Sequence, residues 1–195
     1  NIQHIVDLSR RKPLVAGDTL IFSYEIDTKD YPGANSLFVE INPDEDQPEQ
    51  YHFNNYAIHN FYVRPDDANP LLDVTFDGVH ILNNDIVSAK PHVLIKLKDE
   101  NKFLALDDTT LLKVQVRFPD GRLRTFSFTS DTLRFTPANL NAGSVNDNTA
   151  TIDFNPAFLE DGDYEMIVSG SDKSGNKSGQ AEYRVGFKII NKPMI

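Results

Sequence analysis

A period of two governs the apolar residues of this chain. In LLKVQVRF, Leu112, Val114 and Val116 alternate with Lys113 and Gln115, so the two kinds of side chain would fall on opposite faces of a β-strand. The same alternation occurs in DTLIFSYEID, NSLFVEIN, YAIHNFYV, VLIKLK, TATIDF, DYEMIVSGS and EYRVGFKII. No segment of the sequence keeps a helical period over three turns. The chain is therefore expected to be all-β.

Turn-forming residues separate these apolar runs. The clusters PGAN, NPDEDQP, RPDDANP, FPDGR, EDGD and SGNKSG supply the glycine, proline, asparagine or aspartate that a tight turn needs. Short strands separated by such clusters about every ten residues are typical of sandwiches. We therefore predict tandem immunoglobulin-like antiparallel β-sandwiches, and PDG at residues 119–121 is the clearest hairpin signal.

The segment VRPDDANP, residues 63–70, has the composition of a short linker. It predicts one domain over residues 1–66 and a second over residues 67–195. The second is long enough for a seven-stranded sandwich, whereas the first offers only three or four strands. Because the chain starts without methionine, we expect a segment of a longer protein whose first sandwich is truncated at its N-terminal end. A partner or the second domain would otherwise have to cover the gap.

Composition excludes several classes of function. The net charge is −10 and the isoelectric point is about 4.8, so the surface repels nucleic acid and anionic lipid. No apolar run approaches the roughly 18 residues of a membrane span. The chain has no cysteine, which excludes disulfides, zinc–thiolate sites and a cysteine nucleophile, and it has no tryptophan for glycan stacking.

The stretch SGSDKSGNKSG has some of the spacing of a phosphate-binding loop. Gly170 and Gly175 are correctly spaced, but Asn176 stands where the lysine is needed and Lys177 comes one residue late. The residues that follow alternate like a strand, whereas a phosphate loop precedes a helix. We predict a turn between the last two strands, with Gly175 and Asn176 tolerating positive φ and Asp172 accepting hydrogen bonds from the turn backbone.

Acidic residues in several turns raise the question of calcium. The stretch above is incomplete as a calcium loop, because Lys177 replaces the obligatory glycine and no glutamate follows at the twelfth position. Elsewhere the candidate ligands are Asp44, Asp46, Asp66, Asp67, Asp107 and Asp108. No single loop supplies a full ligand set, so solvated acidic turns are the favoured interpretation. Ca²⁺ is the alternative, and no other cofactor is expected.

The sequence contains no recognisable catalytic constellation. It lacks a Gly-x-Ser-x-Gly elbow and a His-Glu-x-x-His motif, and its five histidines have no metal-ligand spacing. We expect His59 and His92 to be structural or solvent-facing. A pair of carboxylates for glycoside hydrolysis stays open, since the test is a distance across the fold. No catalysis is expected.

Aromatic residues concentrate in PEQYHFNNYAIHNFYV. The residues are Tyr51, His52, Phe53, Tyr56, Phe61 and Tyr62. Alternation gives both faces of this strand an apolar character, as in a strand that is central or covered by another domain. Packing is the favoured interpretation. Binding of a glycan or a protein through an open face is the alternative.

Several segments resemble known bacterial modules. AGDTLIFSYEID followed by NSLFVEINPDEDQPEQYHFNN resembles the second half of the adhesion-related CARDB module. DGDYEMIVSGSDKSGN is similar to bacterial immunoglobulin-like repeats through Gly162, Tyr164, Asp172, Gly175 and Asn176. LLDVTFDGVHILNNDIVSAKPHVLIKLKDENKFLALDDTT and LRFTPANL resemble the region after the catalytic domain in gingipain-like and sortase-like proteins of the type IX, or Por, secretion system.

This resemblance implies a secreted or outer-membrane-associated pair of sandwiches. In the family the catalytic Cys and His belong to an upstream domain, and the nucleophile has no matching position here because the chain has no cysteine. The implied function is to space, orient or dock that upstream cysteine peptidase-like domain, which would be the partner within the same polypeptide. The alternative is an adhesin module that binds a cell-surface protein or glycan.

Overall fold

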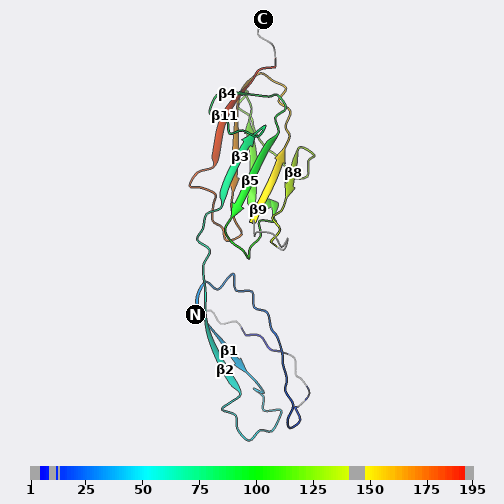
Figure 1. Ribbon diagram of the computed structural model, residues 1–195, viewed down its shortest axis with the longest axis vertical. Helices are drawn as coiled ribbons and strands as arrows, with labels where there is room; N and C mark the ends of the chain where they lie inside the picture. The colour runs from blue at the N-terminus through cyan, green and yellow to red at the C-terminus, as the bar shows by residue number, and fades with distance from the viewer. Residues whose placement is uncertain (1–4, 9–11, 13, 141–147, 192–195) are drawn as a thin grey trace. The chain divides into compact units, whose positions relative to one another are not determined.

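The computed structural model describes residues 5–8, 12, 14–140 and 148–191 (Figure 1). Two compact units divide the chain, unit 1 over residues 1–65 and unit 2 over residues 66–195. Within the described ranges the regular structure is β-strand apart from one short 3-10 turn, η1 (Thr109–Leu111), and no helix is long and apolar enough to cross a membrane. The predicted all-β class is confirmed.

Unit 1 has one antiparallel strand pair. In it, β1 (Gly33–Glu40) lies beside β2 (Tyr56–Val63), with Gly33 opposite Val63 and Glu40 opposite Tyr56. The strand predicted for DTLIFSYEID is wrong, since residues 18–27 take part in no ladder and Ile21 is 86% exposed. Alternation creates an apolar face, but a strand forms only where a neighbour satisfies its backbone hydrogen bonds.

Unit 2 is a β-sandwich of two sheets (Figure 1). One sheet has the order β3 (Leu71–Phe76), β5 (Val93–Asp99), β9 (Asn148–Phe154), β8 (Leu133–Thr136). The other has the order β4 (Asp85–Val87), β11 (Tyr183–Ile189), β10 (Gly162–Gly170), β6 (Leu112–Arg117), β7 (Leu123–Thr125). In immunoglobulin lettering these orders correspond to A-B-E-D and A′-G-F-C-C′. All pairings are antiparallel except that of β4 with β11, which is parallel.

The alternation read from the sequence places the core. Ile95 of β5 faces Ile152 of β9 across the ladder, and both side chains are completely buried. The predicted hairpin at PDG joins β6 to β7, where Gly121 has φ +84° and donates its N–H to the Phe118 carbonyl at 2.9 Å. The strands β5 and β9 therefore bury one face and leave the other accessible to solvent.

Aromatic rings close the core at the start of β10. The Tyr164 ring centroid lies 4.7 Å from that of Phe158 and 5.6 Å from that of Phe187. The Tyr164 hydroxyl donates a hydrogen bond of 2.9 Å to the carbonyl of Glu160, four residues earlier. Burial raises the pKa of this hydroxyl. A buried tyrosine that bonds back to the preceding corner is the tyrosine corner of immunoglobulin-like sandwiches.

Substitution of Tyr164 by Phe tests the tyrosine corner. The change removes the hydroxyl and leaves the Glu160 carbonyl without this donor, so we expect unfolding free energy to fall by about 1–2 kcal/mol in urea denaturation. Tyr183→Phe is the control, because the Tyr183 hydroxyl has no hydrogen bond to any described residue. Equal losses in the two variants would contradict the structural role of the corner.

Candidate functional site

Three aspartates meet at one end of the unit 2 sandwich. Asp66 lies shortly before β3, Asp99 is the last residue of β5, and Asp172 follows β10. Since β3 and β5 are antiparallel, with Leu71 opposite Lys98, the start of β3 lies beside the end of β5. The sheet topology therefore places Asp66 near Asp99.

A glycine allows the end of β10, in the other sheet, to lie close to the end of β5. Gly170 is the last residue of β10, and a Cβ atom there would lie 2.8 Å from Cδ1 of Leu97 in β5. A larger residue at this position would require the buried Leu97 side chain to move. The close approach places Asp172 at the end of β5.

We call Asp66, Asp99 and Asp172 the aspartate cluster. Each offers a carboxylate oxygen, and these oxygens all lie within 4.8 Å of one another. Asp99 and Asp172 are buried, at 4% and 3% exposure, and Asp66 is half-buried. Two like charges 4 Å apart repel by about 4 kcal/mol at an effective dielectric constant of about 20. Within the described part of the chain, no other group of three or more acidic or histidine side chains is gathered in this way.

Asp66 is held by both neighbouring loops. Its Oδ2 accepts hydrogen bonds from Nδ2 of Asn101 at 2.7 Å and from the hydroxyl of Ser174 at 3.0 Å. Its Oδ1 accepts from the backbone N–H of Ala68 at 3.3 Å. The carboxylate thus joins the loop after β5 to the turn after β10.

Asp172 is held by its own turn. Its Oδ1 accepts from the backbone N–H of Asn176 and its Oδ2 from Nδ2 of the same residue, both at 2.8 Å. The predicted backbone bond to Asp172 and the positive φ of Gly175, +91°, are confirmed. The predicted positive φ of Asn176 is wrong. Its amide instead bonds to Asp172 and, at 2.8 Å, to the carbonyl of Asp66.

Asp99 differs from the other two. Neither of its carboxylate oxygens has a hydrogen-bond partner, although both are buried. Burial raises the pKa of Asp99, and repulsion from Asp66 and Asp172 raises it further, while the nearby backbone N–H groups of Asn101 and Glu100 counteract this in part. A buried carboxylate without partners is costly and rare in folded proteins.

The loop after β5 is shaped by one buried asparagine. Asn148 accepts the N–H of Leu106 at 2.9 Å and donates from Nδ2 to the carbonyls of Asn101 and Leu104, at 2.9 and 2.8 Å. These bonds fix the backbone of the loop that carries the Asn101 side chain to Asp66. The arrangement of the cluster is thus held by surrounding structure.

The cluster has no basic partner among the described residues. No lysine, arginine or histidine in those ranges forms an ion pair with its members. The adjacent Lys173 instead places Nζ 2.5 Å from Oδ1 of Asp107. Within the described ranges, the polar contacts that Asp66 and Asp172 make are therefore hydrogen bonds and not ion pairs.

The other predicted calcium ligands lie elsewhere. Asp107 forms the ion pair with Lys173. Asp108 caps η1, accepting the N–H of Thr110 at 2.8 Å, and this hydrogen bond lowers its pKa. Asp67 follows Asp66 directly but takes no part in the cluster.

Asp44 and Asp46 belong to a loop of unit 1. Asn42 organises this loop, because its Nδ2 donates to the carbonyl of Gln47 at 2.7 Å and to Oε1 of Glu49 at 2.6 Å. Neither aspartate is grouped with two further potential metal ligands among the described residues. Of the six predicted ligands, the structure brings only Asp66 to the aspartate cluster.

Sequence reasoning missed Asp99, although a signal was present. In VLIKLKD the alternation places Val93, Ile95 and Leu97 on the core face, and the next position on that face is Asp99. An aspartate at a buried position of a strand needs a partner or a ligand. The sequence pattern relates Asp172 only to its own loop, because the other two members of the cluster come from distant segments.

The aromatic strand of unit 1 is largely exposed. On one face of β1 and β2, Ser36 donates a 2.6 Å hydrogen bond to Oδ1 of Asn60, and the rings of Phe38 and Tyr56 stack with centroids 6.2 Å apart. Phe38, Tyr56 and Tyr62 on this face are 53–69% exposed. Among the described residues β2 pairs with β1 alone, so the expectation of a central strand is wrong, whereas cover by another domain stays a prediction.

Two histidines pair with aspartates on the surface of unit 2. His80 lies 2.6 Å from Asp73, and His92 lies 2.8 Å from Asp153 across the β5–β9 ladder. All four side chains are solvent-accessible, so these are surface pairs of modest energy. His92 is solvent-facing, as expected.

Comparisons with known proteins identify no family. No family model matches the chain, and no curated protein matches it. The solved structures that match include CopC from Methylosinus trichosporium OB3b. That match has a TM-score of 0.35 and 16% sequence identity, and it covers 65% of this chain and 100% of the CopC chain.

Replacement of Asp99 by Asn should stabilise the metal-free protein. The amide removes a buried charge and can donate to the neighbouring carboxylates, so we expect unfolding free energy to rise by about 1–3 kcal/mol in buffer with a chelator. Urea denaturation measures this change. Asp163→Asn is the matched control, since Asp163 lies exposed near the opposite end of β10. A loss of stability in Asp99→Asn would show that the carboxylate is satisfied after all.

Proposed function

We propose that this chain is a non-catalytic β-sandwich region of a larger exported protein. Its role is to space, orient and dock a cysteine peptidase-like catalytic domain at the cell surface. The observation that carries the proposal is the immunoglobulin-like sandwich of unit 2, with its tyrosine corner and continuous core. Such a domain presents fixed surfaces and rigid ends, which a spacer needs.

The interior of unit 2 supports a structural role. Side chains of both sheets fill the space between them, including Val93, Ile95 and Leu97 from one sheet and Val114, Val116 from the other, each fully buried. The resemblance of the second half to regions that follow gingipain-like catalytic domains supports the position of this region in the longer protein. Since the chain has no cysteine, a cysteine nucleophile would have to come from another part of that protein.

The docking role is tested by mixing the chain with the separately purified catalytic domain of its longer protein. We expect the two to co-elute in size-exclusion chromatography, and we expect no peptide hydrolysis by the chain alone. An unrelated peptidase domain of similar size and charge is the control for nonspecific association. Separate elution at tens of micromolar of each component would contradict docking.

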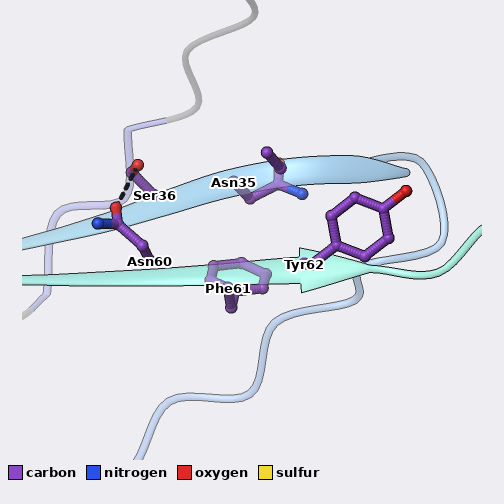
Figure 2. A pocket seen from close by; sticks show the side chains of 6 residues that line it. Asn35, Ser36, Asn60, Phe61 and Tyr62 are labelled. Atoms are coloured by element: carbon purple, nitrogen blue, oxygen red, sulfur yellow. Dashed lines mark hydrogen bonds between the residues drawn. The ribbon is translucent and has the colours of Figure 1, made fainter.

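A second candidate function is adhesion through unit 1. The observation that favours it is the open aromatic face of β1 and β2, where Phe38, Tyr56, Ile58 and Tyr62 are exposed together. Flat aromatic rings beside polar groups such as Asn60 and Ser36 suit sugar rings or an apolar protein surface. Figure 2 shows this polar pair, joined by its hydrogen bond, and the Tyr62 ring farther along the strand pair.

Alanine substitution on this face separates the two functions. If the chain is an adhesin module, Tyr56→Ala and Tyr62→Ala should each weaken binding to a glycan array or to host-cell surface protein by about tenfold or more. Tyr24→Ala is the matched control, because this ring is 51% exposed and lies outside the hairpin. Wild-type binding that survives both substitutions would rule out the aromatic face as the adhesive surface.

A further inference from the structure

The aspartate cluster has more negative charge than its surroundings satisfy. Asp66 and Asp172 accept hydrogen bonds from the adjoining loops, whereas both oxygens of the buried Asp99 have none. Asp107 and Asp108, by contrast, have partners: Asp107 forms an ion pair with Lys173, and Asp108 accepts a hydrogen bond from the backbone of Thr110. An acidic cluster with only a structural role would be expected to provide hydrogen-bond partners for Asp99 in the same way, because this residue is only 4% exposed.

The geometry directs the unsatisfied carboxylate toward its two neighbours. One oxygen from each member lies within 4.8 Å of the others, so a single cation between them could contact all three carboxylates. Such an ion would replace the repulsion among three negative charges by three attractive contacts. It would also supply the partner that Asp99 lacks.

The donor atoms indicate the chemical class of the ion. All three side chains offer oxygen, and the cluster contains no histidine, while the chain has no cysteine. Zinc and copper prefer nitrogen and sulfur ligands, so a hard cation fits better. Additional oxygens are close by in the carbonyl of Asp66, 2.8 Å from Nδ2 of Asn176, and in the hydroxyl of Ser174.

Calcium fits this environment better than magnesium. Ca²⁺ accepts six to eight oxygens in flexible geometry, including carboxylates, carbonyls and water, whereas Mg²⁺ requires a near-ideal octahedron and keeps most of its water. Because Asp99 and Asp172 are buried, an ion that contacts both would have to lose part of its hydration shell, which Mg²⁺ does reluctantly. We propose that Asp66, Asp99 and Asp172 form a Ca²⁺ site of unit 2, in addition to the spacing role proposed above.

This site would link three segments that are distant in sequence. The ion would hold the residues that lead into β3, the end of β5 and the turn after β10. We expect a dissociation constant of about 10⁻⁴ to 10⁻³ M, in the range of extracellular calcium modules. Calcium at the concentrations found outside cells would then stabilise the segment that precedes β3 at the start of unit 2.

The test is a calcium titration of the full chain after treatment with chelator. In isothermal titration calorimetry we expect one Ca²⁺ per chain, and in thermal unfolding we expect 10 mM CaCl₂ to raise the Tm by about 3–10 °C. The same concentration of MgCl₂ should produce less than half of this rise. The control variant Asp163→Asn should retain the full response, because it removes one charge away from the cluster.

Substitutions within the cluster should change the Tm differently in chelator and in calcium. Asp99→Asn should raise the Tm in chelator yet remove the Ca²⁺-dependent rise, and Asp172→Asn should weaken binding at least tenfold. A higher Tm in chelator together with a lost calcium response identifies a metal site, because replacing a purely structural carboxylate would not remove a response to calcium. Absence of heat and of a Tm shift in the wild-type chain would overturn the proposal. An unchanged calcium response in Asp99→Asn would overturn it equally.

Discussion

The close packing of the two sheets of unit 2 is the constraint on which the candidate site depends. Gly170 lets β10 approach Leu97 of β5 so closely that a Cβ would not fit. This contact brings the ends of β5 and β10, which belong to different sheets, to the same end of the sandwich. The aspartates that follow these strands become neighbours as a result, and their mutual repulsion is set by the core packing beneath them.

The fold of unit 2 holds the three carboxylates of the aspartate cluster close together, and their repulsion lowers the stability of the metal-free folded state. Asn148 fixes the loop after β5, and Asn176 and Ser174 fix the turn after β10 against Asp66. The surrounding hydrogen bonds therefore hold three carboxylates together while one of them has no partner. Departures from the usual satisfaction of buried polar groups concentrate at functional sites, where a ligand supplies what the protein lacks.

The same alternation of apolar and polar residues leads to buried strands in unit 2 and to exposed strands in unit 1. In unit 2, alternating strands find partners on both sides and a facing sheet, so their apolar faces are buried. In unit 1, the same alternation gives one hairpin, and rings such as Phe38 and Tyr56 stay exposed. The difference lies in the number of strands available, because a two-stranded ribbon cannot bury a face by itself.

The sequence by itself determined the all-β class, the strands β5, β6, β9, β10 and β11 of unit 2, the PDG hairpin and the turn that contains Gly175, because these follow from alternation and local turn chemistry. It also named Asp66 as a candidate ligand, but it did not single out Asp99. Only the tertiary structure decided that Asp66 meets Asp99 and Asp172, that Asp107 pairs with Lys173, and that residues 18–27 form no strand. Those outcomes depend on contacts between segments far apart in the chain, and local pattern contains no information on which distant ends will meet.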